Sequence, residues 1–289
     1  MLQVPYNFCG DPDEPDYSAA RVVLIPVPYG GTATYRAGAA DGPRAILEAS
    51  RNLETFDEEL CCETIDAGIH SLQGGLPPDD AGQVVVEVEQ LVGQAVDDGK
   101  FPIVLGGEHS VTVGGVRAFG ERLENLSVLQ IDAHADLRET YRGNPYNHAC
   151  VGSCIRRICP LVQIGVRSLS AEEHPRTNRG NVSTFFMHLW KPQEDLYRVL
   201  DRLSDEVYVT IDLDALDPSI MPGTGTPEPG GFTWAEVTAI LREVARQKQV
   251  VGFDVTELSP IPGSVVSEFT AAKLVYRFLG YIARGRGWV

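Results

Sequence analysis

Short apolar runs of β-strand length alternate with helical patterns along most of the chain. The runs lie at residues 22–25, 102–105, 127–131, 161–166, 207–211 and 250–255. Apolar residues recur with helical spacing at residues 42–53, 82–96, 194–203, 234–247 and 267–279, and a further helix is expected to begin at Ser110. Because parallel strands need crossover connections, this alternation predicts a mostly parallel sheet covered by helices.

Three of these runs lead directly into side chains that bind metal ions. Residues i and i+2 of an extended backbone point the same way, and parallel sheets bind ligands at the carboxyl ends of their strands. A lone histidine in a GGEH loop or a single DxD motif more often has a structural role, but three such motifs at three strand ends together indicate a binuclear metal site. The six candidate ligands are His109, Asp132, His134, Asp136, Asp212 and Asp214.

Carboxylate oxygens dominate this ligand set, which also holds two imidazoles and no thiolate. Such a set favours Mn²⁺, with Co²⁺, Ni²⁺ or Fe²⁺ as alternatives. Asp132 or Asp212 can bridge two ions about 3.5–4 Å apart, and a water molecule between the ions would have a pKa of about 7. The product is a hydroxide at neutral pH, so the expected reaction class is hydrolysis.

Two further residues have suitable chemistry. His148 follows the Asp132 motif on a loop, and an imidazole there can carry protons between bulk water and the site. The alternative for His148 is a surface or core imidazole without a catalytic part. Glu257 follows the strand at residues 250–255 and can hold a cationic substrate group beside the metals. The alternative for Glu257 is a capping or ion-paired carboxylate.

Length and charge narrow the class of protein. The chain has 289 residues and 43% apolar content without a break in composition, which predicts one large α/β domain over residues 1–289. A formal charge of −16 disfavours nucleic acid and anionic membranes as partners and favours a small cationic substrate. No signal peptide and no apolar run of membrane-spanning length is visible, so we expect a cytosolic protein.

Six cysteines leave one alternative metal site open. Cys150, Cys154 and Cys159 lie close together after His148, which raises the possibility of an iron–sulfur or zinc site. The chain has no CxxC motif and no second half of such a site. We therefore expect reduced, partly buried thiols.

From about Pro26 to the last helix, the chain resembles the ureohydrolases: arginase, agmatinase, formiminoglutamase and their relatives. The shared segments are GAADGPR at 38–44, GGEHS at 106–110, DAHAD at 132–136, DLDALDP at 212–218, TGTPEPGG at 224–231 and DVTE at 254–257. The resemblance implies a three-layer α/β/α sandwich with two Mn²⁺ ions per subunit. It also implies hydrolysis of a guanidino compound to urea and an amine, by a homo-oligomer that is a trimer or a hexamer.

The resemblance also implies a role for each candidate ligand. His109 and Asp136 correspond to terminal ligands of one manganese, and His134 and Asp214 to those of the other. The bridging carboxylates are then Asp132 and Asp212.

Four residues take catalytic or substrate-binding roles by the same resemblance. Asp136 takes the proton of the attacking hydroxide and passes it to the leaving nitrogen, and His148 matches a proton-shuttle histidine. Glu257 matches a glutamate that grips the guanidinium, and Thr226 is expected to support Glu257 by a hydrogen bond.

The segments 138–141 and 146–150 are most similar to bacterial and archaeal agmatinases, which favours hydrolysis of agmatine to putrescine and urea. Glu228 and Glu139 are candidates to receive the distal ammonium of agmatine. Arg138 stands where arginases typically place an asparagine that reads the substrate carboxylate. If Arg138 points into the pocket, it favours guanidinobutyrate, guanidinopropionate or formiminoglutamate instead, and arginine also remains an alternative.

Two alternatives belong to other classes of protein. A metal-stabilised scaffold would keep the ligands without turnover, but all six ligand positions, His148 and Glu257 carry competent residues. A binuclear phosphoesterase would need cationic groups around the phosphate, whereas this site is lined by carboxylates.

Overall fold

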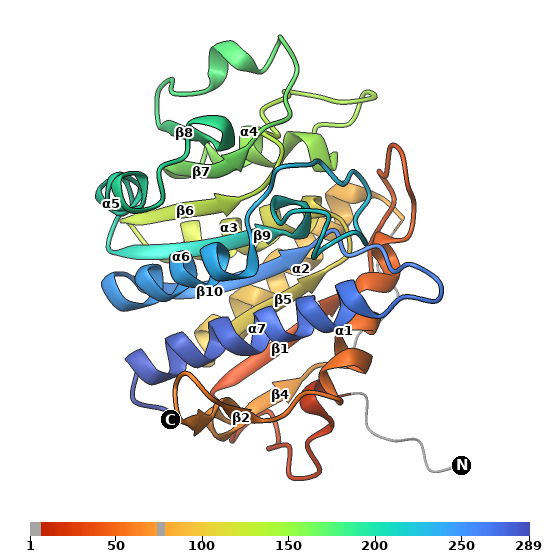
Figure 1. Ribbon diagram of the computed structural model, residues 1–289, viewed down its shortest axis with the longest axis vertical. Coiled ribbons are helices and arrows are strands. Elements are labelled where there is room, and N and C mark those ends of the chain that lie inside the picture. The colour runs from red at the N-terminus through yellow and green to blue at the C-terminus, as the bar shows by residue number, and fades with distance from the viewer. Residues whose placement is uncertain (1–6, 74–78) are drawn as a thin grey trace.

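The structure is a computed structural model that describes residues 7–73 and 79–289. Eight strands form its central sheet (Figure 1). They are β1 Val22–Val27, β4 Ile69–Ser71, β5 Phe101–Gly106, β6 Leu126–Ile131, β7 Leu161–Val166, β8 Val182–Phe186, β9 Glu206–Asp212 and β10 Gln249–Thr256. Neighbouring strands all pair in parallel, in the order β4-β1-β5-β10-β9-β6-β7-β8. The strands β2 Phe56–Asp57 and β3 Cys62–Glu63 form a separate antiparallel pair.

Helices cover both faces of the sheet. They are α1 Gly42–Ser50, α2 Ala81–Asp97, α3 Thr112–Gly120, α4 Val151–Ile155, α5 Pro192–Arg202, α6 Trp234–Gln247 and α7 Val266–Gly285. α1, α5, α6 and α7 share one apolar cluster with the sheet, and α2, α3 and α4 share a second cluster on the opposite face (Figure 1). The three-layer α/β/α sandwich with a mostly parallel sheet is therefore confirmed.

Short 3₁₀ helices shape the connections. They are η1 Phe8–Gly10, η2 Ala39–Asp41, η3 Thr64–Ala67, η4 His109–Val111, η5 His148–Cys150, η6 His174–Arg176, η7 Met187–Leu189 and η8 Leu213–Ala215. Two of them, η4 and η8, begin within the candidate metal-binding motifs, and η5 carries His148. The chain therefore turns sharply where those side chains must be presented.

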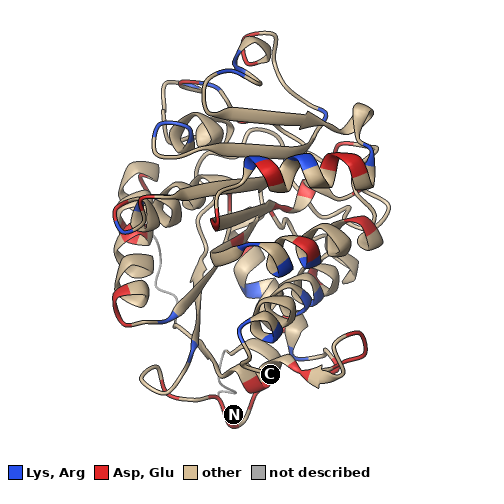
Figure 2. Cartoon of the chain, turned by 90° about the vertical axis from the view of Figure 1, so that its left-hand side faces the viewer, with Lys and Arg blue, Asp and Glu red and all other residues tan. Residues whose placement is uncertain are grey.

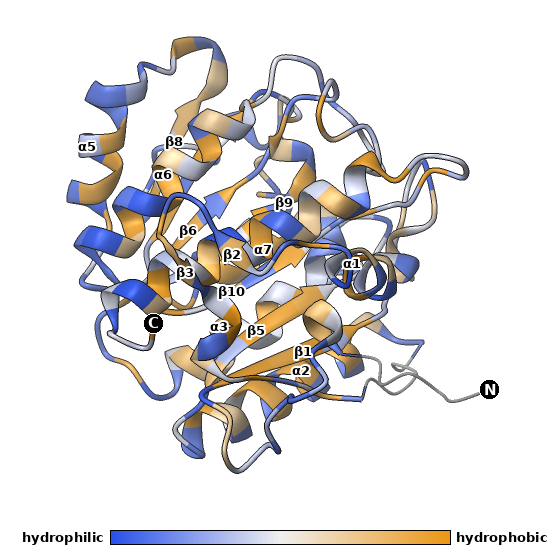
Figure 3. Ribbon diagram, turned by 60° about the horizontal axis from the view of Figure 1, so that its bottom comes forward, coloured by the Kyte–Doolittle hydropathy of each residue, from blue (hydrophilic) through white to orange (hydrophobic). Residues whose placement is uncertain are grey.

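Burial on both faces explains why the strands read as continuous apolar runs. Every residue of β5, β6 and β7 is buried, as parallel strands between two helix layers require. Figure 3 shows β1 and β5 as largely hydrophobic ribbons, while helices carry hydrophilic residues on their outer sides.

Charged residues lie mainly outside this core. Figure 2 shows acidic and basic residues on the helices and loops, whereas the strands are mostly free of them. No helix in the described ranges is long and apolar enough to cross a membrane.

The sheet order determines where the sequence motifs meet. β5, β10, β9 and β6 are adjacent at the centre of the sheet, although they come from distant parts of the chain. Because the strands are parallel, their carboxyl ends share one edge. The GGEHS, DVTE, DLDALDP and DAHAD segments lie at or directly after the carboxyl ends of these four strands, in that order, and are brought together there.

Candidate metal centre and active site

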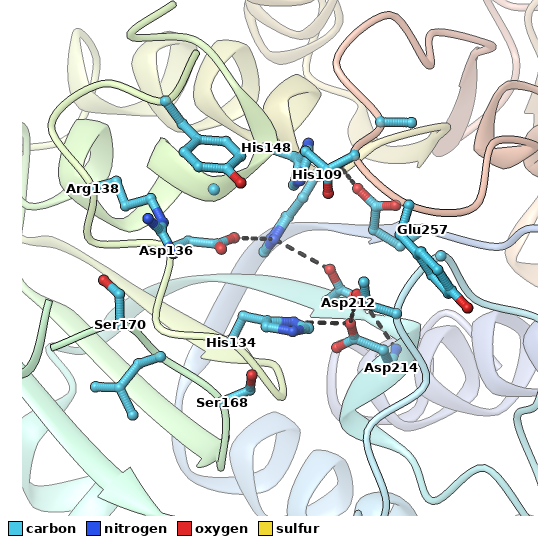
Figure 4. Close-up of a pocket in the computed structure, with 18 of the residues that line it drawn as sticks. His109, His134, Asp136, Arg138, His148, Ser168, Ser170, Asp212, Asp214 and Glu257 are labelled. Carbon is cyan, nitrogen blue, oxygen red and sulfur yellow. Dashed lines mark hydrogen bonds and ion pairs between the residues drawn. The ribbon is translucent and has the colours of Figure 1, made fainter. Parts of the chain in front are cut away.

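His109 lies at the centre of the candidate site, just beyond β5 (Figure 4). Its Nδ1 is 3.2 Å from Asp132 Oδ2, 3.1 Å from Asp136 Oδ2 and 3.4 Å from Asp212 Oδ2. The imidazole and all three carboxylates are buried. The structure therefore brings four of the predicted ligands to one point.

His134 forms a second group with the remaining candidates. Its Nδ1 is 3.0 Å from Asp214 Oδ2 and 3.7 Å from Asp132 Oδ1. His109, Asp132 and Asp212 form one set, and Asp132, His134 and Asp214 form another, each with one ligand atom per residue within 4.8 Å of the others. Asp132 belongs to both sets and turns one oxygen toward each histidine, as a bridging carboxylate would.

Local hydrogen bonds explain why these motifs leave the strands as they do. Asp132 Oδ1 accepts from His134 N at 2.6 Å, and Asp212 Oδ1 accepts from Asp214 N at 3.0 Å. Aspartate side chains commonly close such turns on the backbone two residues further on. The spacing of both motifs therefore bends the backbone and places two ligand side chains on the same side.

A buried chain of hydrogen bonds fixes the tautomer of neutral His109. Thr210 Oγ1 lies 2.9 Å from His109 Nε2 and donates its hydrogen to Asp254 Oδ1 at 2.6 Å. Because a hydroxyl has one hydrogen, the Thr210 oxygen must accept from His109 Nε2–H. Tyr208 donates to the other oxygen of Asp254, which holds that carboxylate in place. His109 Nδ1 is then left with a lone pair that faces the carboxylates.

A divalent cation fits this arrangement of donors. Three carboxylate oxygens lie within 3.4 Å of His109 Nδ1. These oxygens and the lone pair on Nδ1 repel one another unless a positive charge lies among them. Burial lowers the pKa of His109, but hydrogen bonds to Asp132 and Asp136 raise it well above its usual value. The space beside His109 Nδ1 therefore attracts positive charge. A donor set of carboxylate oxygens and imidazole nitrogens suits Mn²⁺ and similar ions.

The crowding also shifts the acidity of the carboxylates. Burial and the charge of Asp132 raise the pKa of Asp136 to about 7. Burial and the charges of Asp214 and Asp132 raise the pKa of Asp212 well above its usual value. Without a cation, these two side chains therefore take up protons far more readily than ordinary aspartates.

Two candidate residues have a left-handed backbone. Asp136 has a φ of 50° and Glu257 a φ of 67°, a conformation that is unfavourable for residues other than glycine. The surrounding chain holds both: Ser153 N donates to Asp136 O at 3.1 Å, and Glu257 N donates to Gly107 O at 2.7 Å. Backbone strain of this kind is concentrated at functional sites.

Glu257 lies across the pocket from Arg138, as Figure 4 shows. Its Oε1 accepts a hydrogen bond from His109 N at 2.7 Å. Burial and the nearby charge of Glu108 raise the pKa of Glu257 to about 8. A positively charged group in the pocket would favour the ionised form of this carboxyl.

His148 lies in η5 and also lines the pocket. Its Nδ1 is 2.9 Å from Thr32 Oγ1, and Thr32 Oγ1 donates to Glu108 Oε1 at 2.8 Å. The Thr32 oxygen therefore accepts from His148 Nδ1–H, which leaves Nε2 as an acceptor. Burial and the charges of His109 and His134 lower the pKa of His148 to about 4, so the ring is neutral at physiological pH.

The pocket has a cavity volume of about 260 Å³, and Arg138 forms part of its wall. Arg138 Nε is 3.5 Å from Glu173 Oε2, and its guanidinium carbon lies 4.6 Å from the centre of the Tyr141 ring. The buried Glu173 carboxylate also accepts hydrogen bonds from Ser170 and from Leu137 N. The positive charge of Arg138 is thus matched inside the pocket wall.

Two expected substrate contacts are not formed in the structure. Thr226 Oγ1 donates to Asp214 Oδ2 at 3.3 Å, and no hydrogen bond to Glu257 is formed among the described residues. Glu139 does not line the pocket, because its carboxylate is bound by Arg156 and Arg157. Glu228 Oε1 lies 4.0 Å from His134 Nε2 and is partly exposed, so it stands beside the candidate centre.

Several residues around the site were not identified from the sequence. All but Glu173 share a detectable signal: each is polar and lies inside, or just after, an apolar strand run. Glu108 lies within the GGEHS segment, Thr210 and Asp254 interrupt buried strands, and Glu173 follows β7 at the ligand-binding edge.

The three clustered cysteines are separate from the candidate metal centre. Cys150, Cys154 and Cys159 form no disulfide and are buried. Burial raises the pKa of Cys150 and of Cys159 to about 12. In the described ranges, no cysteine belongs to a group with metal-ligand geometry.

Comparisons with known proteins place this fold and site in a family. The profile of the Arginase family matches residues 20–280. An N(1)-aminopropylagmatine ureohydrolase from Synechocystis sp. is 39% identical, covering 92% of this chain and 90% of the relative. An agmatinase from Pyrococcus horikoshii is 36% identical, covering 93% of this chain and 94% of the relative. The crystal structure of the agmatine ureohydrolase of Thermoplasma volcanium has a TM-score of 0.88 at 33% identity, covering 96% of this chain and 94% of that one.

The chain belongs to the Arginase family, and it is a ureohydrolase within it. It is accordingly a metal-dependent hydrolase of guanidino compounds. The predicted family and reaction class are therefore confirmed.

Proposed function

We propose that this enzyme hydrolyses a guanidino compound with a cationic tail, and that agmatine is cleaved to putrescine and urea. The main support is the pair of ligand sets that share Asp132 and face Glu257 in one pocket. The ion pair between Arg138 and Glu173 neutralises the charge of Arg138, which supports a substrate whose tail is cationic.

Two divalent cations, proposed to be Mn²⁺, would be held by His109, Asp132, Asp136 and Asp212 on one side and by His134, Asp214 and the shared aspartates on the other. When bound, they would acidify a water molecule and so supply the nucleophile at neutral pH. The protein supplies binding, orientation and proton transfer.

Glu257 holds the substrate. Its half-buried carboxylate is the natural partner of a guanidinium, because ionised groups of opposite charge in a partly desolvated pocket stabilise each other. The hydrogen bond from His109 N fixes Oε1 and leaves Oε2 for the substrate. Glu257 thereby places the guanidinium carbon beside Asp136 and His148.

Asp136 and His148 move the protons. Water adds to the guanidinium carbon while Asp136 accepts the proton that the water loses. The same proton passes to the leaving nitrogen as the carbon–nitrogen bond breaks, and the remaining hydroxyl proton is also transferred to the amine, so that urea and a protonated amine are released. His148, neutral and with Nε2 as an acceptor, exchanges protons between the leaving group and solvent.

Arg138 bears on the identity of the tail. An unpaired arginine in the pocket wall would attract a carboxylate, but Arg138 is paired with the buried Glu173 and stacked on Tyr141. The pair adds little net charge, while Glu228 adds a negative one near the centre. A cationic tail is therefore favoured over a carboxylate.

N(1)-aminopropylagmatine is a second candidate substrate. Relatives of that name from Synechocystis sp. and Thermus thermophilus are each 39% identical to this chain over more than 90% of its length. This compound carries the same guanidino group on a longer cationic tail. The same pocket chemistry therefore serves both candidates.

The test is urea release by the Mn²⁺-loaded enzyme from agmatine, N(1)-aminopropylagmatine, arginine, guanidinobutyrate and guanidinopropionate, with formiminoglutamate followed through formamide. We expect a cationic-tailed substrate to exceed all carboxylate-bearing ones in kcat/KM by at least about tenfold, equivalent to about 1.4 kcal/mol. A carboxylate-bearing winner would overturn the assignment of the tail. No turnover with metal bound would favour a catalytically silent scaffold.

A further inference from the structure

A row of buried polar side chains crosses the sheet beneath the candidate ligands. Strand register pairs Thr184 of β8 with Gln163 of β7, Gln163 with Gln130 of β6, Gln130 with Thr210 of β9, and Thr210 with Asp254 of β10. All five side chains are buried. Buried polar groups are costly unless they are hydrogen bonded, so a continuous row of them in an apolar sheet needs an explanation.

Three members of the row form a chain of hydrogen bonds that ends on Asp132. Thr184 Oγ1 donates to Gln163 Oε1 at 2.8 Å, and Gln163 Nε2 donates to Gln130 Oε1 at 2.9 Å. Gln130 Nε2 then donates to Asp132 Oδ2 at 2.7 Å. The other hydrogen of Gln163 Nε2 is taken by Ala135 O at 2.6 Å, within the DAHAD segment itself.

The direction of this chain is fixed by its last member. An ionised carboxylate only accepts hydrogen bonds, so Gln130 must turn its NH₂ group to Asp132 and its carbonyl to Gln163. Gln163 must therefore turn its NH₂ group to Gln130 and its carbonyl to Thr184. The Thr184 hydroxyl is left to donate, so a single arrangement satisfies every group.

We propose that Thr184, Gln163 and Gln130 are positioning residues that hold the Asp132 carboxylate for cation binding and so set the metal affinity of the enzyme. The inference rests on the metal centre of the proposed function. Asp132 Oδ2 is the oxygen 3.2 Å from His109 Nδ1, and Asp132 belongs to both ligand sets. A misplaced Asp132 therefore weakens both sites.

The sharpest test lies at the far end of the chain, three hydrogen bonds from Asp132. Thr184→Val replaces the hydroxyl by a methyl group of similar shape, whereas Thr184→Ser keeps the hydroxyl. Metal-free full-length protein is titrated with Mn²⁺ alone, and free Mn²⁺ is followed by its electron paramagnetic resonance signal. Loss of partners behind metal ligands typically weakens metal binding by about 10- to 100-fold. We expect about tenfold for Thr184→Val and a Kd within about twofold of wild type for Thr184→Ser.

Gln130→Leu removes the hydrogen-bond donor to Asp132 directly. We expect its loss of Mn²⁺ affinity to be about 100-fold, the upper end of that range. Ser127→Ala is the matched control, because Ser127 is a buried polar residue of β6 whose hydroxyl binds Ser204 outside the chain. Its Mn²⁺ affinity should remain that of wild type. Melting temperatures of the metal-free variants separate metal affinity from general destabilisation.

The inference is overturned if Thr184→Val binds Mn²⁺ as wild type does, or if Thr184→Ser and Ser127→Ala lose affinity to the same extent as Thr184→Val. Comparison of Thr184→Val with Thr184→Ser is sufficient to test the inference, so the test remains valid even if Gln130→Leu does not fold. Absence of Mn²⁺ binding by wild type would remove the proposed metal centre itself. These results are distinguishable, since the first two occur with a wild type that binds Mn²⁺.

Discussion

Asp136 has an unusual backbone conformation, a close contact with His109 and a raised pKa. Its backbone is left-handed, its carboxylate lies 3.1 Å from His109, and its pKa is raised to about 7. A carboxylate held this firmly beside the reacting atoms is placed to accept a proton and to return it. The proposed proton transfer therefore follows from where the residue is held.

Asp136→Asn should abolish most turnover while the protein stays folded. The amide has the same shape but accepts no proton, and losing a general acid–base group typically costs about 10²- to 10⁴-fold in rate. Folding should tolerate it because the metal-free site already favours a neutral side chain at this position. The measurements are kcat on agmatine and circular dichroism; a near-normal kcat would contradict the assigned role.

Glu173→Gln should shift the charge preference of the enzyme. The substitution leaves Arg138 without its anionic partner in the pocket wall. The kcat/KM of carboxylate-bearing substrates should therefore rise, and that of cationic substrates should fall. We expect the kcat/KM ratio of agmatine to guanidinobutyrate to fall by about tenfold, the equivalent of about 1.4 kcal/mol.

Arg138→Gln should move the same ratio in the opposite direction. Glu172→Gln is the control, since Glu172 is exposed and pairs with Arg176 outside the pocket. If the kcat/KM ratio is unchanged in both the Glu173 and the Arg138 variants, this ion pair does not determine substrate preference.

Among the elements, those with a regular burial pattern could be predicted from sequence. The helix expected at 234–247 coincides with α6, and the run at 161–166 coincides with β7. The helices expected at 42–53 and 267–279 end at Ser50 and Gly285 instead, because helix ends depend on capping more than on periodicity. The edge strands β4 and β8 were not predicted: they are short and partly exposed, so their apolar signal is weak.

α6 begins with a capping box that makes its boundary testable. Glu236 N donates to Thr233 Oγ1 at 3.3 Å, and the Glu236 carboxylate accepts from Thr233 N at 2.8 Å. Thr233→Ala should lower stability by about 1 kcal/mol, or about 2–4 °C in Tm, without changing kcat. Thr233→Ser should keep the wild-type Tm; equal losses in both variants would exclude the hydroxyl as the cause.

For the molecule as a whole, the candidate metal-binding motifs could be found from the sequence, but only part of their surroundings could be. His109, Asp132 and Asp212 could be grouped because each follows a strand of one parallel sheet. Glu173 and the Thr210 hydroxyl could not, since their contacts depend on strand order and register. Those are set by packing between segments far apart in the chain.

Metal removal should destabilise the whole molecule, and more so at alkaline pH. Burial and neighbouring charges raise the pKa of Asp136 to about 7 and of Glu257 to about 8 in the absence of metal. A carboxyl with a raised pKa adds stability below the ordinary pKa of about 4 and loses that contribution as pH rises through the raised value. The metal-free protein should therefore be more stable at pH 6 than at pH 8.5.

Thermal unfolding with Mn²⁺ and with EDTA checks this. A cation at 100 times its Kd adds about 2.7 kcal/mol, so a Tm gap of about 5 °C or more is expected at pH 8.5 and a smaller one at pH 6. A gap that is absent, or that widens toward acid pH, would contradict the expected balance of charges.

The position of β10 has a consequence for how the protein is made. This strand comes last of the eight sheet strands in chain order, yet it lies between β5 and β9 and pairs with both. Without residues 249–256, the sheet divides into β4-β1-β5 and β9-β6-β7-β8, and the inner edge of each part is unpaired. The ligands from β5 and β9 are then not held side by side, and Glu257 is missing. Assembly of the candidate active site therefore has to wait for β10, and a nascent chain stalled before β10 would expose two strand edges that invite aggregation.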